Sequence, residues 1–291
     1  MASPSRDFYT LSRRSSDLDA IEAAFPRYLK LRSICWLLRL GVRTPEGVVL
    51  ADRSEHAIAA AIDYAQSHNW ARFLLRHDSP SDQPRPVQGG FLVEISELGP
   101  WTARFVHGGV CILLEPFDAI RNGYNLSWLI ERSATLVELV GPGFDASDLQ
   151  RGQIQPHEIR SVDLDSKRFG PPKLIAAHDY RHSVAHRERK IWWKYRLREL
   201  VTDRWRDLDD AEMLACQRYI RDVRGQPIPR TYRPIPAGTL QRCLRNMLSI
   251  VDAWREPSAV VASSFVETGE LIFWDVSTHA RWTASLPSHT C

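Results

Sequence analysis

The stretch at residues 72–118 constrains the fold of this chain more than any other part of the sequence. A short apolar run at 72–76 ends in the cation Arg76, and a loop rich in Pro, Ser, Asp and Gln then closes with Gly89-Gly90. Glycines let backbone N–H groups approach an anion without a side-chain clash, and a cation at a strand end attracts one. Arg76 and the two glycines therefore indicate a phosphate site, or else a structural ion pair followed by an ordinary turn.

Two further strands continue this stretch. One is predicted at 91–95, where apolar and polar positions alternate at the start, and a fully apolar one is predicted at 110–114. The second strand ends at Glu115, which is followed by a proline. Two strands joined by a glycine-ended loop, followed by a buried strand that ends on a carboxylate, are typical of a nucleotide cleft. Glu115 either lines that cleft or only ends the strand.

Helical periodicity dominates the residues before this stretch. The predicted elements are a helix from 18 to Pro26, a helix at 28–40, a strand at 48–50 and a helix at 56–67. Gly41 suits the end of the second helix, because glycine readily adopts the left-handed conformation that often follows a helix. Asp52 and Glu55 resemble a capping box at the start of the third helix. Residues 1–16 are polar, and we expect a mobile tail there.

Composition and charge define the class of protein. Of the 291 residues, 44% are hydrophobic and 25% are charged, which predicts a folded, soluble chain with two domains or two lobes. The net charge of +3 gives no global basic field that would favour nucleic acid. The five cysteines are scattered without CxxC spacing, which indicates free thiols in the cytoplasm and no cysteine zinc site. The sequence predicts no membrane segment, because no apolar run approaches roughly 20 residues.

Residues 28–76 resemble the first lobe of an ATP-grasp protein. A helix, a turn at 41–45 that runs from glycine to proline, a strand, a helix and a strand bearing a cation follow one another in that family's order. Gly89-Gly90 is similar to the family's glycine-rich loop, and residues 111–115 are similar to its hinge strand, which ends in Glu. Arg76 stands where the family usually has Lys, and it can grip phosphate oxygens as a two-pronged donor.

The second lobe of the family has counterparts as well. Residues 125–141 look like the antiparallel pair that opens this lobe, residues 240–254 look like a helix, and residues 258–277 look like its closing hairpin, with the turn at Thr268-Gly269. Asp275 takes the position of a metal-ligand Glu and Ser277 that of an Asn. Ser263 or Ser264 falls where a preceding metal-binding Asp would lie. A short carboxylate and a hydroxyl can still hold Mg²⁺, which keeps several waters.

The resemblance implies an α+β, ATP-grasp-like fold: two lobes with antiparallel sheets, a nucleotide cleft between them and a helical insert. The expected divisions are an N-terminal tail and helix at 1–28, a first lobe at 29–112, and a second lobe at 113–291 with a loop and helical insert at 141–238. ATP and Mg²⁺ are the implied cofactors. Their implied ligands are Arg76, Gly89 and Gly90 for the phosphates, Leu113, Glu115, Phe117 and Asp118 for adenosine, and Asp275 with Ser277 for the metal.

The activity that the resemblance implies is ATP-dependent ligation in the cytoplasm. A carboxylate is activated as an acyl-phosphate, and an amine, a peptide or an aminoacyl-tRNA then attacks it. Fewer than 30 residues precede the first lobe, where the family usually carries a further domain. We therefore expect the insert, a second copy of this chain in a homo-oligomer or a partner protein to hold the second substrate.

Residues 141–158 are dense in turn formers and hold charged side chains, among them Arg151. They form either a surface loop or a loop at the cleft mouth that places Arg151 on an anionic substrate. Further along, His178, His182 and His186 recur every four residues. On a helix they would share one face, as a solvated stripe or as metal ligands.

A basic segment with interleaved aromatics occupies residues 181–206. It is either a surface helix whose aromatics face the core, or a surface that binds phosphate-rich partners such as RNA. In the ATP-grasp interpretation, Arg187 could instead stabilise the phosphoryl group during transfer. The alternative function is thus a non-catalytic nucleotide- or RNA-binding module.

Overall fold

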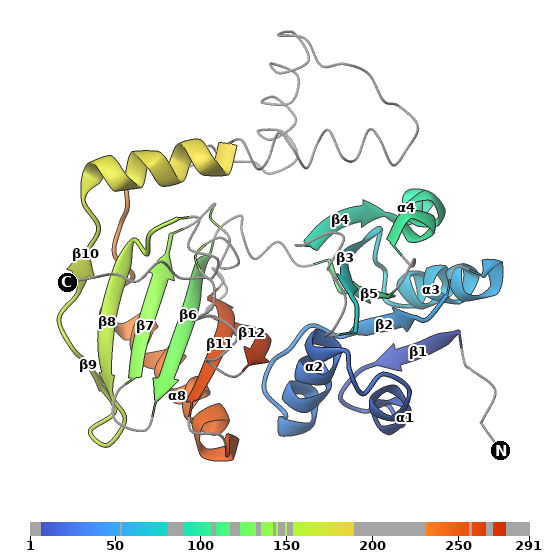
Figure 1. Ribbon diagram of the computed structural model, residues 1–291, viewed down its shortest axis with the longest axis horizontal. Helices are drawn as coiled ribbons and strands as arrows, with labels where there is room; N and C mark the ends of the chain where they lie inside the picture. Colours follow the sequence, from blue (N-terminus) through green and yellow to red (C-terminus); the bar gives the residue numbers. More distant parts are fainter. Residues whose placement is uncertain are drawn as a thin grey trace, which may run out of the picture. The chain divides into compact units, whose positions relative to one another are not determined.

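The computed structural model describes residues 7–52, 54–80, 90–105, 109–116, 123–131, 135–141, 144, 149, 154–188, 231–255, 258–265 and 270–277. The described residues up to 116 belong to one compact unit, and those from 123 onward belong to a second (Figure 1). Each unit combines helices with one antiparallel sheet. This confirms the predicted α+β class with two antiparallel sheets.

The described part of the first unit has a five-stranded sheet in the order β1-β2-β5-β3-β4, and every neighbouring pair is antiparallel. Its elements are β1 (Phe8–Leu11), α1 (Asp17–Ala24), α2 (Leu29–Leu40), β2 (Gly47–Leu50), α3 (Glu55–Ser67), β3 (Arg72–Asp78), β4 (Gly90–Glu94), the 3-10 turn η1 (Ile95–Glu97), α4 (Leu98–Phe105) and β5 (Val110–Leu114). The predicted helices and strands are all present. The lobe boundary expected at residues 112–113 falls inside β5.

Two local features of the first unit differ from the sequence prediction. Residues Phe8–Leu11, expected in a mobile tail, form the edge strand β1, in which Phe8 pairs with Leu50 of β2. The cap of α3 is Ser54, whose hydroxyl accepts the backbone N–H of Ala57 at 3.2 Å. Asp52 acts one step earlier, because its carboxylate accepts the N–H of Ser54. As predicted, Gly41 ends α2 in the left-handed conformation, with a φ of 79°.

Helices α3 and α4 cover one face of the first sheet. Alanines at 57, 61 and 65 lie one turn apart on α3 and are fully buried, so the helix backbone can approach the sheet closely. They belong to an apolar cluster with Trp101 of α4, Phe73 and Leu75 of β3, and Leu113 of β5. Alternation along β3 directs the side chains of Phe73 and Leu75 to this face and those of the residues between them to the other.

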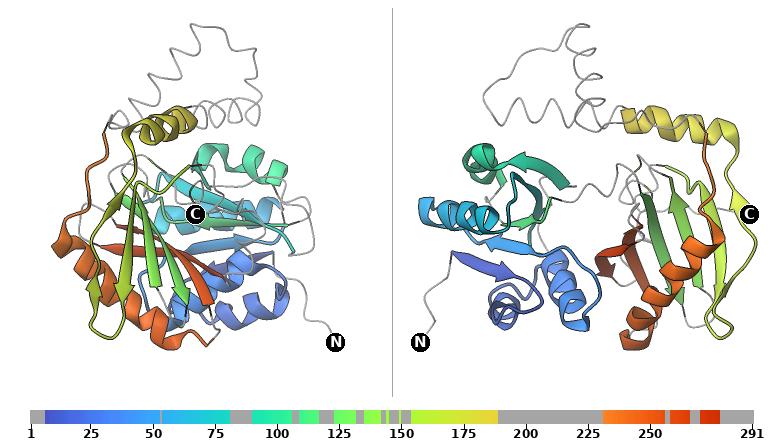
Figure 2. Two further views of the ribbon diagram at one scale, coloured as in Figure 1. Left: turned by 60° about the vertical axis from the view of Figure 1, so that its left-hand side comes forward. Right: turned by 180° about the vertical axis from the view of Figure 1, so that it is seen from behind.

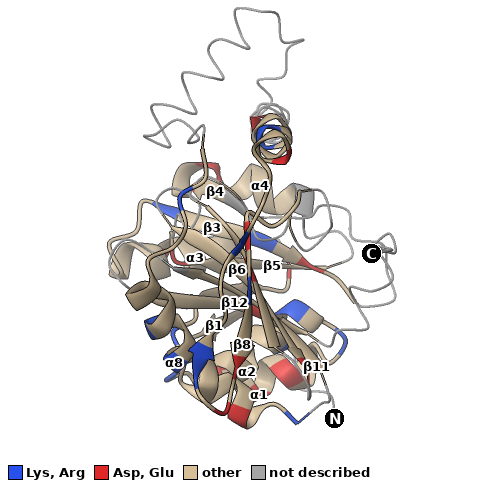
Figure 3. Cartoon of the chain, turned by 90° about the vertical axis from the view of Figure 1, so that its left-hand side faces the viewer, with Lys and Arg blue, Asp and Glu red and all other residues tan. Residues whose placement is uncertain are grey.

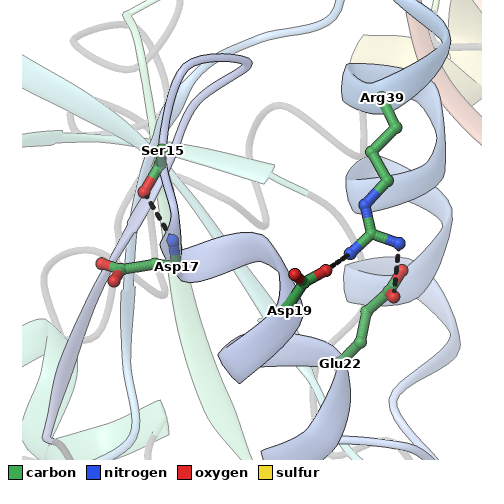
Figure 4. A network of polar contacts seen from close by, with 5 residues as sticks. All are labelled: Ser15, Asp17, Asp19, Glu22 and Arg39. Atoms are coloured by element: carbon green, nitrogen blue, oxygen red, sulfur yellow. Dashed lines mark hydrogen bonds and ion pairs between the residues drawn. The ribbon is translucent and has the colours of Figure 1, made fainter.

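Surface ion pairs connect α1 and α2 (Figure 4). The Arg39 guanidinium of α2 lies 2.5 Å from the carboxylate of Asp19 and 2.8 Å from that of Glu22, both on α1. The Asp17 carboxylate accepts the backbone N–H of Thr10 at 2.8 Å, which ties α1 to β1. Because Arg39 and Asp19 are exposed, the pairs orient α1 and contribute little to stability.

A buried carboxylate joins β3 to the start of α2. Asp78 is fully buried, and its Oδ2 accepts the backbone N–H groups of Lys30 and Leu31 at 2.9 and 3.0 Å. Lys30 Nζ in turn donates to the carbonyl oxygen of His77 at 3.0 Å. Asp78 thus supplies, from a strand, the cap that α2 lacks in its own sequence. Gly109 must be glycine here, since a Cβ would lie 2.2 Å from the Asp78 carbonyl oxygen.

The described part of the second unit has a seven-stranded antiparallel sheet in the order β10-β8-β7-β6-β11-β12, with β9 beside β8. Its elements are β6 (Tyr124–Glu131), β7 (Thr135–Val140), β8 (Glu158–Asp163), β9 (Arg168–Phe169), β10 (Lys173–Leu174), a helical segment at 177–188, α8 (Ala237–Ala253), β11 (Ser258–Phe265) and β12 (Leu271–Ser277). The predicted pair β6–β7, the predicted helix α8 and the predicted hairpin β11–β12 are confirmed.

The predicted loop and helical insert requires a correction. Its residues 158–174 form β8, β9 and β10, and β8 pairs with β7 as part of the sheet. The strand pattern of β8 is hidden because Glu158, a residue type expected in water, is fully buried at its start. Arg160 pairs with this carboxylate, and the Tyr232 hydroxyl donates to it at 2.5 Å, which offsets its desolvation.

Helix α8 runs across one face of the second sheet (Figure 2). It buries Leu240, Leu244 and Met247, which recur at helical spacing. Arg242 and Arg245 are exposed, and the charged positions of α8 are coloured in Figure 3. None of the helices in the described segments has the length and hydropathy that a membrane span requires.

Replacement of Asp78 tests the link between α2 and β3. Asp78→Ala leaves two buried N–H groups without an acceptor, so we expect it to lower the free energy of unfolding by about 2 kcal/mol. Asp78→Asn keeps an oxygen acceptor and should cost less. Urea denaturation measures both variants, and Asp63→Ala on the exposed face of α3 is the control. Equal stability of Asp78→Ala and the control would contradict this role.

Candidate functional site

One face of the second sheet carries a row of polar and small side chains. Glu138 of β7 pairs with Ser127 of β6, Ser127 pairs with Ala262 of β11, and Ala262 pairs with Asp275 of β12. Directly paired residues project to the same side of an antiparallel sheet. Glu138, Ser127, Ala262 and Asp275 therefore form one row, here called the polar row, with a carboxylate at each end and small residues between.

A β-bulge sets the end of the polar row. Asp275 pairs with Ala262, whereas Phe273 pairs with Ser263, so Trp274 is an extra residue in β12. Trp274 Nε1 donates to the Ser264 hydroxyl at 2.6 Å. Ser264 lies two residues from Ala262 and shares its face, so Trp274 and Asp275 both serve the face that carries the polar row.

A chain of hydrogen bonds fixes the Ser264 hydroxyl, to which the Trp274 indole donates. The Ser264 hydroxyl bonds to Asn125 Oδ1, and Asn125 Nδ2 donates to the Phe144 carbonyl oxygen at 2.5 Å. Ser264 and Asn125 are buried, and these bonds satisfy groups that would otherwise be costly to bury. The indole of Trp274 is thereby held in place beside Asp275.

The carboxyl group of Glu138 differs from an ordinary surface glutamate. Burial raises its pKa above the usual value. A carboxylate in such surroundings gains from binding a proton or a cation. The sequence prediction missed Glu138, because alternation in the segment TLVELV assigns this position to the solvent face of a strand.

Both predicted metal ligands lie on the face of the polar row. Ser277 pairs with Val260 of β11, two residues from Ala262, so it projects to the same side as Asp275. Of the two serines considered for the third ligand, Ser264 shares this face. Ser263 points to the opposite face, where its hydroxyl accepts the Trp128 indole N–H at 2.9 Å.

Two predicted phosphate ligands lie side by side in the first unit. Arg76 is half-buried on β3 and pairs with Gly90 of β4 on one side and with Ile112 of β5 on the other. Gly90 has no side chain to cover the Arg76 stem from the β4 side. Leu113 is buried in the apolar cluster and pairs with Leu75, so its side chain serves the core.

Glu115 has a partner within its own unit. Arg43 Nη1 and Nη2 lie 2.5 and 2.9 Å from the two carboxylate oxygens of Glu115, which is a bidentate ion pair. The Glu115 backbone N–H donates to the Glu46 carbonyl at 2.8 Å. The pair fixes the exit of β5 against the segment before β2.

The remaining predicted residues divide into two groups. Gly89, Phe117, Asp118 and Arg151 lie outside the described residues. Arg187 is buried on the helical segment 177–188, where the predicted histidine stripe is also found.

The histidine stripe is helical, as its spacing predicted. His178 and His182 are exposed, and His178 pairs with Asp179 at 2.9 Å. Across the described ranges no group of three His, Cys, Asp or Glu side chains is arranged to hold a metal ion.

Comparisons with known proteins show similarity in structure but none in sequence. No protein-family model matches the chain, and no curated protein matches it in sequence. Among solved structures, the chain is similar to the D-alanine-D-alanine ligase from Helicobacter pylori, with 13% identity and a TM-score of 0.41. The alignment covers 91% of this chain and 63% of the ligase chain, so this chain spans less than two thirds of that protein's length.

The stability of Glu138→Gln tests the electrostatics of the polar row. Because burial disfavours the ionised form of Glu138, we expect the neutral amide to raise the free energy of unfolding by about 1 kcal/mol at pH 7.5. The advantage should shrink as the pH falls toward about 4, where the wild-type carboxyl is protonated in both the folded and the unfolded chain.

Urea denaturation at both pH values measures this difference, and Asp165→Asn on an exposed turn is the control. A Glu138→Gln variant that is less stable than the wild type at pH 7.5 would show that the carboxylate has a stabilising partner, against our interpretation.

Proposed function

We propose that this protein is an ATP-grasp-like enzyme that binds Mg-ATP, activates a carboxylate as an acyl-phosphate and ligates it to an amine or a related nucleophile. The observation that supports this most directly is the polar row in the second sheet. It brings Asp275, on the hairpin that the sequence resemblance assigns to the metal, onto one face with Glu138 and Ser277.

The donor set suits Mg²⁺. This ion prefers oxygen ligands and binds through one or two carboxylates together with phosphates and water. Asp275 and Ser277 supply a carboxylate and a hydroxyl on one face of β12. Mg²⁺ bound there would offset the negative charge of the triphosphate.

The first unit would bind the phosphates. Arg76 would grip phosphate oxygens through two N–H groups, and the backbone of Gly89-Gly90 would approach them closely. The sequence resemblance assigns the nucleoside to residues 113–118. Within that range Glu115 is already oriented by Arg43.

The proposed reaction has two steps. A carboxylate oxygen of the substrate attacks the γ-phosphorus of ATP, the bond to ADP breaks, and an acyl-phosphate forms. The amine then attacks the acyl carbon, loses a proton, and phosphate leaves. The task of the chain is to position the reactants and to neutralise charge on the transferring oxygens. We assign the cationic part of that task to Arg76, Arg151 and Arg187.

A non-catalytic nucleotide- or RNA-binding module is the second candidate. The bidentate pair between Arg43 and Glu115 favours the RNA-binding form of this module, since a carboxylate already held by the fold is less open to a nucleoside. A nucleotide-binding module would bind Mg-ATP without turnover, whereas an RNA-binding module would not require Mg-ATP. The basic segment at 181–206 would then provide the surface for RNA.

Calorimetric titration with ATP, with and without Mg²⁺, tests the binding sites. We expect Arg76→Ala to lower the affinity for ATP about tenfold, both with and without Mg²⁺, because it removes a phosphate ligand. Asp275→Asn should remove only the gain in affinity that Mg²⁺ brings. Asp252→Asn, on the exposed side of α8, is the matched control and should bind as the wild type does. Wild-type affinity in both Arg76→Ala and Asp275→Asn would refute the assignments.

Turnover separates the two candidates. Release of ADP is measured with a panel of amino acids as carboxylates and amines as nucleophiles. The proposed ligase releases ADP only when a carboxylate is present, and Arg76→Ala lowers the rate. Tight Mg-ATP binding without ADP release over the whole panel would favour the non-catalytic module.

A further inference from the structure

A buried histidine in the second unit lies inside a cage of aromatic rings. His157 is fully buried directly before β8. Its ring centroid lies 4.5 Å from that of Phe144, 4.7 Å from that of Tyr180 and 5.4 Å from that of Tyr232. We call these four residues the His157 cluster.

The His157 cluster holds together segments that are distant in the sequence. Tyr180 belongs to the helical segment 177–188, and Tyr232 belongs to the segment 231–236 that leads into α8. The Tyr232 hydroxyl donates to Glu158 of β8 at 2.5 Å. The cluster is therefore the place where both segments are attached to the start of β8.

Further bonds of the segment 231–236 reach the same part of the sheet. The backbone N–H of Ile235 lies 3.4 Å from the Glu158 carboxylate, and the Tyr124 hydroxyl donates to the Arg233 carbonyl at 3.0 Å. These contacts hold the segment together with the Tyr232 hydroxyl bond and the buried side chain of Ile235.

The imidazole of His157 is suited only to its neutral form. Its Nδ1 accepts the backbone N–H of Gly141 at 3.1 Å, which places the single proton on Nε2. No hydrogen-bond partner for Nε2 is found among the described residues. A second proton would turn Nδ1 into a donor facing another donor, and it would place a full charge among aromatic rings. Protonation thus costs both a hydrogen bond and the desolvation of a cation.

The other ionisable groups that face the cluster do not offset this cost. Glu158 is already engaged by Arg160 and by the Tyr232 hydroxyl. Tyr180 and Tyr232 are neutral, because burial raises the pKa of both phenols, that of Tyr180 to about 12. Burial also lowers the pKa of His157 from its ordinary value to about 4.

We propose that His157 is a proton-operated latch, whose protonation opens the His157 cluster and releases the segments 177–188 and 231–236 from β8. The latch is independent of the proposed ligase activity, because it rests on the cage, the Gly141 bond and the attachment through Tyr232. An opened imidazole in water regains the ordinary histidine pKa, so protons bind the open state more tightly than the closed one.

The size of the effect follows from the two pKa values. With a pKa of about 4 in the closed state and about 6.5 in the open state, the opening equilibrium should increase about 30-fold between pH 7.5 and pH 5.0. Above about pH 7.5 neither state is appreciably protonated, and protons no longer favour opening.

Hydrogen exchange of the full-length chain measures the opening directly. After correction for the intrinsic pH dependence of exchange, peptides from 177–188 and 231–240 should lose protection about 30-fold between pH 7.5 and pH 5.0. The peptide that covers β3, in the other unit, should keep its protection. Equal protection of 177–188 and 231–240 at both pH values would overturn the latch.

Variants identify the group that binds the proton. His157→Asn keeps an acceptor for the Gly141 N–H but does not titrate in this range, so the pH response should disappear. His182→Gln, on the exposed side of the same helix as Tyr180, should retain it. A pH response that persists in His157→Asn, or one that is lost in His182→Gln, would overturn the assignment.

A measurement on the wild type covers the case in which His157→Asn does not fold. Exchange followed at several pH values between 7.5 and 4.5 should show the uptake of one proton on opening, with the change beginning near pH 6.5. A change that begins only below pH 5 would overturn the proposal, because it would indicate carboxyl groups instead.

Discussion

The side chain of Asn125 joins the two polar regions of the second unit. It bonds to Ser264 on the face of the polar row and donates to the Phe144 carbonyl next to the His157 cluster. A buried amide is tolerated only when its hydrogen bonds are made. The Asn125 amide therefore fixes the positions of both the Ser264 hydroxyl and the Phe144 carbonyl. The bulge at Trp274, which positions Asp275, and the ring of Phe144, which packs on His157, are thus parts of one network.

The elements that the sequence predicted are those with a strong apolar period. Helix α2 has apolar residues at helical spacing, strand β5 is apolar throughout, and Gly41 marks the helix end. Strand β1 was missed because four residues carry too short a pattern. Strand β8 was missed because its buried position is Glu158, whose burial depends on Arg160 and Tyr232 elsewhere in the unit. Tertiary partners of this kind leave no trace in local periodicity.

The candidate site was predictable only in part, for the same reason. The order of the elements placed Asp275 and Ser277 on the closing hairpin, and the structure confirms that hairpin. The contribution of Glu138 depends on the register between β7 and β6, which alternation alone does not provide. The choice of Ser264 over Ser263 depends on which face each occupies, which only the pairing of β11 with its neighbours establishes.

Two carboxylates, that of Glu115 at the end of β5 and that of Glu138 in the polar row, have different electrostatic surroundings. Glu115 is bound at both oxygens by Arg43, so its negative charge is already matched within the first unit. For Glu138 the effect of the surroundings is desolvation, which raises its pKa. A fold gains nothing in stability from a carboxylate of the second kind, since an apolar or amide side chain would fit there at lower cost. Folding stability therefore does not account for the place of Glu138 in the polar row.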